Sequence, residues 1–140
     1  MGIVDYTRGA LDAASQSLGD EGPVYMINMV RYRAEADYGG KTEFPPCSGR
    51  EAYLQRYAPA FNKVAQGEDY SVFWIGSVRG MLVAPSDEAW DDVVIVQYSS
   101  FAALHRILTS PAYEAEAAPH RHAALADWRF IATTRVNLPG

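Results

Sequence analysis

Four segments of the chain carry patterns of apolar and polar residues that are typical of β-strands. Residues 23–32 (PVYMINMVRY) are apolar on both faces and rich in β-forming residues, which indicates an interior strand. Residues 69–85 and 90–98 are two further strand-like runs, and the acidic stretch that joins them favours a solvated connection. Residues 127–136 (DWRFIATTRV) predict a closing strand.

Helical spacing of apolar residues marks the segments between these strands. Residues 7–18 place apolar side chains three and four positions apart, which predicts a helix with a thin apolar stripe. A second helix is predicted over residues 48–66, where Ser48 and Glu51 have the spacing of a capping box. Pro59 should kink this helix, because it removes a backbone hydrogen-bond donor.

Two further helical segments complete the order of elements. Residues 99–110 predict a third helix, and Ser110 followed by Pro111 predicts the start of a fourth helical segment. The order is a helix followed by β-α-β-β-α-α-β, which matches the ferredoxin-like α+β plan with one antiparallel four-stranded sheet. We therefore expect residues 1–20 to form an N-terminal helical extension and residues 21–140 to form the ferredoxin-like domain.

One face of such a sheet has no helix over it, and its residues predict a homodimer. Residues 70–83 carry large apolar side chains in both alternating sets, with Phe73 in one set and Trp74 in the other. A contiguous apolar patch on an open sheet face usually marks an interface, and a second copy of the chain is its simplest cover. The long loop 34–49 and the N-terminal helix are additions to the core, and at least one of them is expected to cover a pocket mouth or the dimer partner.

Two stretches resemble the domain-of-unknown-function family 1330 of the dimeric α+β barrel superfamily. They are EAYLQRYAPAFNKVA (51–65) and VVIVQYSSFAALHRILTSPAYEAEAAPHRHAALAD (93–127). The resemblance implies a ferredoxin-like protomer whose sheet packs on a partner's sheet to form a dimeric barrel, and it implies no reaction. In that family an arginine usually follows the tyrosine of the SPxY motif by seven residues. Here that position is His120, and Arg121 comes one residue later.

Composition and charge exclude several classes of protein. The net charge of −5, with no cluster of basic residues, argues against a nucleic-acid partner, because phosphate binding needs a basic face. Cys47 is the only cysteine, so neither an internal disulfide nor a multi-cysteine zinc site can form. No apolar run approaches the ~20 residues of a membrane span, and the N-terminal residues lack the pattern of a signal peptide. We expect a soluble cytoplasmic protein with no membrane partner.

Two of the three histidines lie in PHRHAALADW (119–128). On a regular helix, Tyr113 and His120 share one stripe and His122 lies ~200° away from His120. Two histidines placed in this way cannot bind one metal ion, so we expect no metal site. We expect His120 to face inward and His122 to face solvent. His120 is then either a catalytic acid or base beside a pocket or a partly buried structural residue, and the sequence leaves both interpretations open.

A pocket between the helices and the sheet has five candidate lining residues. Tyr57 and Tyr113 belong to predicted helices, Asn28 and Trp74 belong to predicted strands, and Arg121 follows His120. Aromatic walls with a few polar tips are the ordinary form of a small-molecule site. A buried amide such as that of Asn28 needs a hydrogen-bond partner in the protein, in water or in a ligand.

Three functions remain open from the sequence. The first is a cofactor-independent enzyme of the cyclase, isomerase or monooxygenase type that acts on a small aromatic or hydrophobic molecule, an analogy of fold alone. The second is a non-catalytic dimer that binds a small hydrophobic ligand. The third is a haem-handling protein, for which no histidine has a convincing axial position. We expect no cofactor.

Overall fold

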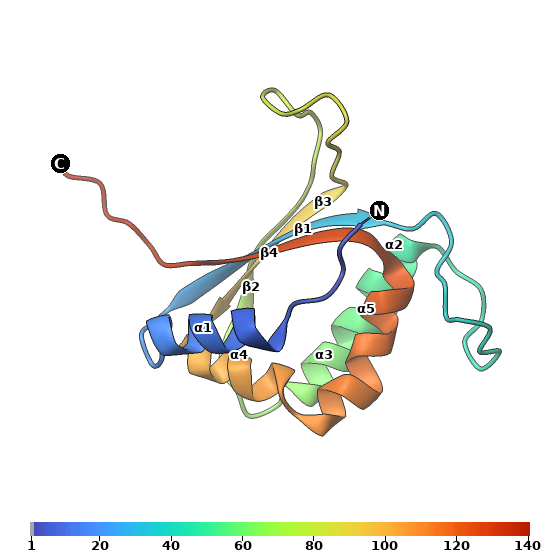
Figure 1. Cartoon of the computed structure of the whole chain (residues 1–140), viewed down its shortest axis with the longest axis horizontal. Helices are drawn as coiled ribbons and strands as arrows, with labels where there is room; N and C mark the ends of the chain where they lie inside the picture. Colours follow the sequence, from blue (N-terminus) through green and yellow to red (C-terminus); the bar gives the residue numbers. More distant parts are fainter. Residues whose placement is uncertain (1) are drawn as a thin grey trace.

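The computed structural model describes residues 2–140 and has one antiparallel four-stranded sheet with its helices on a single face (Figure 1). The strands are β1 (Val24–Tyr32), β2 (Tyr70–Ser77), β3 (Asp92–Tyr98) and β4 (Leu125–Thr133). The α-helices are α1 (Arg8–Leu18), α2 (Gly49–Glu51), α3 (Ala58–Val64), α4 (Phe101–Leu108) and α5 (Ala118–Ala124). Two π-helical turns, η1 (Ala52–Tyr57) and η2 (Tyr113–Ala117), lead into α3 and α5.

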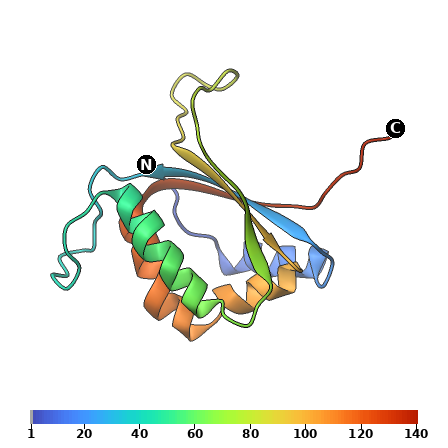
Figure 2. The ribbon, with the colours of Figure 1, turned by 180° about the vertical axis from the view of Figure 1, so that it is seen from behind.

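The spatial order of the strands is β2-β3-β1-β4, so β1 and β3 form the centre of the sheet. Both neighbours of β1 run antiparallel to it, as does β2 beside β3. This arrangement, with one helical crossover between β1 and β2 and another between β3 and β4, confirms the ferredoxin-like fold. Seen from behind, the helices again lie together on one side of the sheet and leave its other face open (Figure 2).

Short polar side chains begin the helices, at Ser48 and Ser110 as the sequence predicts and also at Thr7, which the sequence pattern places within the predicted helix. The hydroxyl of Thr7 accepts a hydrogen bond from the amide of Ala10 at 3.0 Å and so caps α1. Ser48 and Glu51 form the predicted capping box, in which each side chain accepts from the other residue's amide at 3.0 Å. Ser110 accepts from the amide of Tyr113 and starts the last helical segment.

The core lies between the sheet and the helices. Several side chains on the helix-facing side of β1 and β4 are fully buried, and examples are Val24, Val30 and Leu125. Phe101 and Leu104 of α4 pack onto this layer together with Leu11 of α1. One layer of helices on one sheet face is therefore enough to bury the apolar stripes that the sequence shows.

Both crossovers contain the same irregularity, a π turn that precedes a proline. The amide of Ala58 bonds to the carbonyl of Tyr53, and the amide of Ala118 bonds to that of Tyr113, in each case five residues back. Pro59 and Pro119 follow these alanines. A proline ring clashes with the carbonyl four residues earlier, and widening the turn relieves that clash. The kink expected at Pro59 thus takes the form of one extra residue in the turn.

Strand β2 contains an irregularity of the same size. Val72 pairs with Val96 and Trp74 pairs with Ile95, so Phe73 is an extra residue between two consecutive pairs. Such a bulge reverses the alternation of side chains beyond it. Val72 and Ile75 consequently share the helix-facing side, while Trp74 lies on the open face.

Three segments extend from this body (Figures 1 and 2). The connection 78–91 rises on the side of the sheet opposite the helices, and residues 134–140 extend away from the sheet. The loop 33–48 hangs beside α2 and α5. Among residues 2–140, no helix has the length and apolar character that crossing a membrane requires.

Candidate functional site

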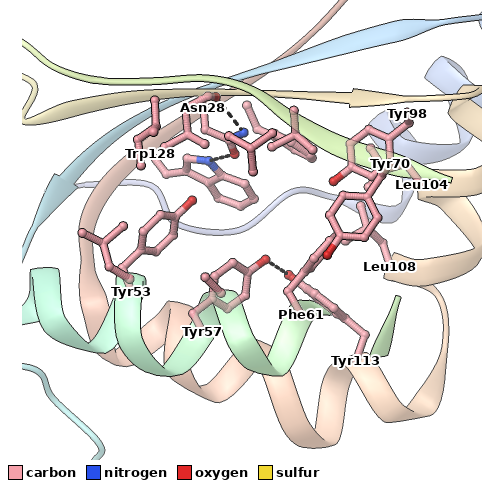
Figure 3. A pocket seen from close by; sticks show the side chains of 17 residues that line it. Asn28, Tyr53, Tyr57, Phe61, Tyr70, Tyr98, Leu104, Leu108, Tyr113 and Trp128 are labelled. Atoms are coloured by element: carbon pink, nitrogen blue, oxygen red, sulfur yellow. Dashed lines mark hydrogen bonds between the residues drawn. The ribbon is translucent and has the colours of Figure 1, made fainter. Parts of the chain in front are cut away.

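A cavity of about 160 Å³ lies between the sheet and the segment from η1 to α3 (Figure 3). Its helical wall includes Tyr53, Tyr57, Phe61, Leu104 and Tyr113. Its sheet wall includes Asn28, Val94, Val96, Trp128 and Phe130. Val72 and Ile75 of the edge strand also line it, and both remain about half exposed, so the cavity opens between β2 and the helix beside it.

The polar groups of Asn28 and Trp128 in the sheet wall already have partners within the protein. The side-chain oxygen of Asn28 accepts a hydrogen bond from the indole nitrogen of Trp128 at 3.0 Å (Figure 3). The amide nitrogen of Asn28 donates to the carbonyl of Val94 at 3.1 Å. The need for a partner that the buried amide implies is therefore met by protein, and the remaining polar groups of this wall are the hydroxyls of Tyr70 and Tyr98.

Tyrosine hydroxyls supply the polar character of the helical wall. The rings of Tyr53 and Tyr57 stack with centroids 5.2 Å apart, and the hydroxyl of Tyr57 lies 2.8 Å from that of Tyr113. Burial raises the pKa of Tyr53, Tyr57 and Tyr113 above the ordinary value, so all three carry their protons at neutral pH. The cavity thus presents neutral hydroxyls, which can donate as well as accept.

Arg121 lies directly behind this wall, in a side chain that is 3% exposed. One terminal nitrogen donates to the hydroxyl of Tyr113, and the other donates to the carboxylate of Asp5 at 2.9 Å. Its guanidinium also lies over the ring of Trp128, 4.9 Å from the ring centroid. A buried cation is stable only when it is paired and hydrogen-bonded, and these contacts meet that condition.

Asp5 continues the chain of contacts to the surface. Its carboxylate lies 2.6 Å from Nε2 of His122, and its side chain is 63% exposed. Burial on its own would raise the pKa of Asp5, but the hydrogen bonds and charges of His122 and Arg121 outweigh it and lower that pKa. A polar path therefore runs from the cavity to solvent through Tyr57, Tyr113, Arg121, Asp5 and His122.

His120 lies outside the cavity, and the inward orientation expected for it is wrong. Its Nδ1 is 2.7 Å from the hydroxyl of Tyr38, and its ring packs edge-on against Phe44, 5.1 Å between centroids. Both partners belong to the loop 33–48, so His120 fastens that loop to α5. The π turn explains the error. On a regular helix, the residue seven positions after Tyr113 is His120 and would face inward. The extra residue of the turn moves Arg121 into that position instead.

No family model matches this chain, and no curated protein matches it. Two crystal structures of the RPA0582 protein, which is described as a protein of unknown function from Rhodopseudomonas palustris, do match. The methylated form is 33% identical with a TM-score of 0.83, and the match covers 97% of this chain and 96% of that one. The other structure is also 33% identical, with a TM-score of 0.84 and coverage of 99% and 100%. This chain belongs to the family of the RPA0582 protein.

Trp74 is the second site residue of this RPA0582-family chain that the structure leaves out of the cavity. Its side chain is 59% exposed on the open sheet face, where its indole nitrogen lies over Gly76. Strict alternation with Val72 would place Trp74 in the cavity, but the bulge at Phe73 turns it away and brings Ile75 there instead.

Three of the six predicted site residues line the cavity together, namely Asn28, Tyr57 and Tyr113. Arg121 contacts the site through Tyr113. Sequence reasoning did not assign Tyr53, Tyr98 or Asp5 to the site. Tyr53 was detectable, since it falls on the same helical face as Tyr57. Asp5 gave no signal, because its contact with Arg121 joins residues 116 positions apart.

The other two histidines do not line the cavity. His105 contacts Asp12 at 3.3 Å on the outer surface of α4, and His122 belongs to the path described above. Within residues 2–140, no three side chains of histidine, cysteine, aspartate or glutamate gather in a way that could hold a metal ion.

Proposed function

We propose that this protein binds a small aromatic molecule in the cavity between its sheet and its helices. The single observation that supports the proposal is the combination of size and lining. A cavity of about 160 Å³ is comparable to one of roughly 150 Å³ that accepts benzene. Apolar and aromatic walls with a few convergent polar groups are the usual form of a small-molecule site. The ligand is therefore one substituted ring or an apolar molecule of that size.

The path from Tyr57 to the surface favours an enzyme over a passive carrier. A carrier of apolar molecules has no use for a buried arginine held against a cavity hydroxyl, since burying that charge costs free energy. We infer a cofactor-independent enzyme of the isomerase or cyclase type, whose substrate bears an oxygen within reach of Tyr57. Haem is not part of the proposal, because a cavity of this volume holds one ring and no histidine lines it among residues 2–140.

We also propose that the protein is a homodimer that pairs through the open sheet face. Large apolar side chains lie there at least two-fifths exposed, and they include Phe73, Trp74 and Ile131. Leu82 and Val83, each 96% exposed, extend from the connection 78–91 on the same side of the sheet. A patch of this kind is typical of an interface. The resemblance to family 1330 and its dimeric α+β barrels supports a second copy of the chain as the partner.

A matched pair of substitutions on β3 tests the binding site. Val94 lines the cavity, whereas Ile95, the next residue, points to the opposite face of the strand. We expect 4-nitrotoluene to bind the wild-type protein in isothermal titration calorimetry. Val94→Phe fills the cavity and should abolish binding, while Ile95→Phe adds the same ring outside the cavity and should preserve it.

Two results would contradict the proposed binding site. If 4-nitrotoluene does not bind the wild-type protein, or if both variants bind it with unchanged affinity, the cavity is not the binding site. Circular dichroism of each variant establishes that a lost signal does not come from unfolding.

A further inference from the structure

Arg121 fixes the direction of every hydrogen bond between it and the cavity. A guanidinium only donates, so the hydroxyl oxygen of Tyr113 must accept from Arg121. Tyr113 is fully buried, and among residues 2–140 its hydroxyl has one other partner, the hydroxyl of Tyr57. The proton of Tyr113 therefore points to Tyr57, because any other direction would leave a buried donor unpaired.

The same reasoning gives the direction of the Tyr57 proton. The oxygen of Tyr57 accepts from Tyr113 and has no other protein partner in the described chain. Its own proton is then directed away from Tyr113, toward the cavity that Tyr57 lines (Figure 3). An unoccupied donor that faces an apolar cavity selects a ligand with an acceptor atom at that point.

The charge of Arg121 strengthens this donor. Hydrogen bonds in a chain polarise one another, and the chain here begins at a cation. Asp5 neutralises Arg121 only in part, because the Asp5 side chain is 63% exposed and solvent screens its charge, whereas the arginine is buried. The cavity therefore lies in a positive field, and the hydrogen-bonded chain that begins at Arg121 ends at Tyr57.

We propose that the cavity binds its ligand through a negatively charged oxygen, the phenolate or enolate oxygen of a single-ring molecule. This oxygen accepts a hydrogen bond from the hydroxyl of Tyr57. This inference rests on the proposed function, since it names the ligand class of the same cavity. Arg121 acts as a positioning residue that does not touch the ligand. The arrangement is that of an oxyanion site, in which donors aimed at one oxygen stabilise the charge that develops there.

Neutral groups surround that oxygen on every other side. The ionisable side chains that line the cavity are all tyrosines, and burial raises the pKa of each of them: Tyr53, Tyr57, Tyr70, Tyr98 and Tyr113. None of the lining residues is acidic, so no carboxylate opposes an anionic ligand.

The probe is 4-nitrophenol, whose neutral and ionised forms have different absorption spectra. We expect the ionised form to bind about tenfold more tightly than the neutral form, which lowers the pKa of the bound probe by about one unit. A spectroscopic pH titration with protein in excess measures this shift. The matched apolar probe, 4-nitrotoluene, reports binding without the oxygen.

Three variants distinguish the effect of the relay, which is the hydrogen-bonded chain Arg121–Tyr113–Tyr57, from the effect of the cavity itself. Tyr57→Phe should remove the preference for the ionised probe and leave the affinity for 4-nitrotoluene within about twofold, because the ring stays in place. Arg121→Lys should reduce the preference, since lysine keeps the charge without the planar fork that reaches both Tyr113 and Asp5. Tyr38→Phe is the control, because Tyr38 lies outside the cavity, where its hydroxyl contacts His120 and takes no part in the relay.

Each outcome decides between the two proposals. Failure of 4-nitrotoluene to bind overturns the proposed function. Binding of 4-nitrotoluene together with equal affinity for the two forms of 4-nitrophenol overturns the oxyanion site alone. Retention of the full preference in Tyr57→Phe also overturns it, as does its loss in Tyr38→Phe.

Discussion

His120 and Arg121 are neighbours in sequence with opposite roles. Arg121 is buried behind the cavity, whereas His120 packs against Tyr38 and Phe44 of the loop 33–48. The imidazole accepts a hydrogen bond from the Tyr38 hydroxyl only while Nδ1 is unprotonated. Burial, and after it the charge of Arg56, lowers the pKa of His120 and favours that neutral form. These contacts favour the second of the two interpretations left open by the sequence, in which His120 is a structural contact of the loop.

The lowered pKa of His120 predicts a loss of stability in acid. The unfolded chain takes up this proton more readily than the folded chain, so the free energy of unfolding falls as pH drops below the ordinary value of 6.5. The fall ends below the lowered pKa of the folded state. We expect His120→Gln to lose less stability than wild type between pH 7.5 and pH 5, measured as the shift of the urea midpoint.

The same variant tests whether His120 has a role in the cavity. At pH 7.5 its affinity for 4-nitrotoluene should equal that of the wild-type protein, because no atom of His120 lines the cavity. An equal loss of stability in both proteins would contradict the structural role, and a loss of 4-nitrotoluene binding would restore the catalytic one.

Elements differ in how far their sequences reveal them. The caps at Ser48 and Ser110 were predictable, because a short polar side chain before a helical stripe has one physical use. The faces of Tyr57 and Tyr113 were predictable for a similar reason, since each begins or continues a regular stripe. Trp74 and His120 were not, because each lies beyond an inserted residue that shifts the pattern by one. Proline marks the π turn only indirectly, and nothing in the composition of β2 marks its bulge.

The π turn η2 makes a deletion tolerable at one place in the chain. Removing exposed Ala115 and replacing Pro119 with alanine, which takes away the ring that would clash in a regular turn, leaves Arg121 seven helical residues after Tyr113, where it still faces the hydroxyl. We expect this deletion variant to fold and to bind 4-nitrotoluene, with a melting temperature within several degrees of wild type. Deleting exposed Arg106 from the regular helix α4 should prevent folding, because it rotates Ile107 and Leu108 out of the core.

Thermal unfolding followed by circular dichroism distinguishes these two deletions. Equal damage from both would contradict the description of η2 as a turn with one surplus residue. Tolerance of the Arg106 deletion would contradict the regular packing of α4.

At the scale of the whole molecule, the order and type of the elements were enough to predict the fold. Four strands and two helical crossovers with one apolar face each allow few compact arrangements, and the ferredoxin-like sheet order is one of them. The location of the cavity was harder to predict. It depends on Asp5, Arg121 and Tyr113 meeting across most of the chain, and no local pattern encodes such a contact. The N-terminal segment thus contributes a residue behind the site rather than a cover over its mouth.

The open face makes a prediction about assembly. Leu82 and Val83 have no packing role within the protomer, so replacing both with aspartate should not unfold it. We expect the wild-type protein to sediment as a dimer at micromolar concentration and the double variant to sediment as a monomer, because two buried charges would face the partner. Gln16→Asp with Gln55→Asp adds the same charge on exposed helical positions and should stay dimeric. A wild-type monomer would contradict the dimer.

The central claim is that a single-ring ligand lies in the cavity with its oxygen on Tyr57, and a crystal structure of the protein with 4-nitrophenol tests it most directly. We predict density for the ring between Trp128 and Tyr57, with the phenolic oxygen about 2.5–3.0 Å from the Tyr57 hydroxyl. An empty cavity in crystals that hold the probe elsewhere would contradict the claim. A ring in the cavity whose phenolic oxygen points away from Tyr57 would contradict it as well.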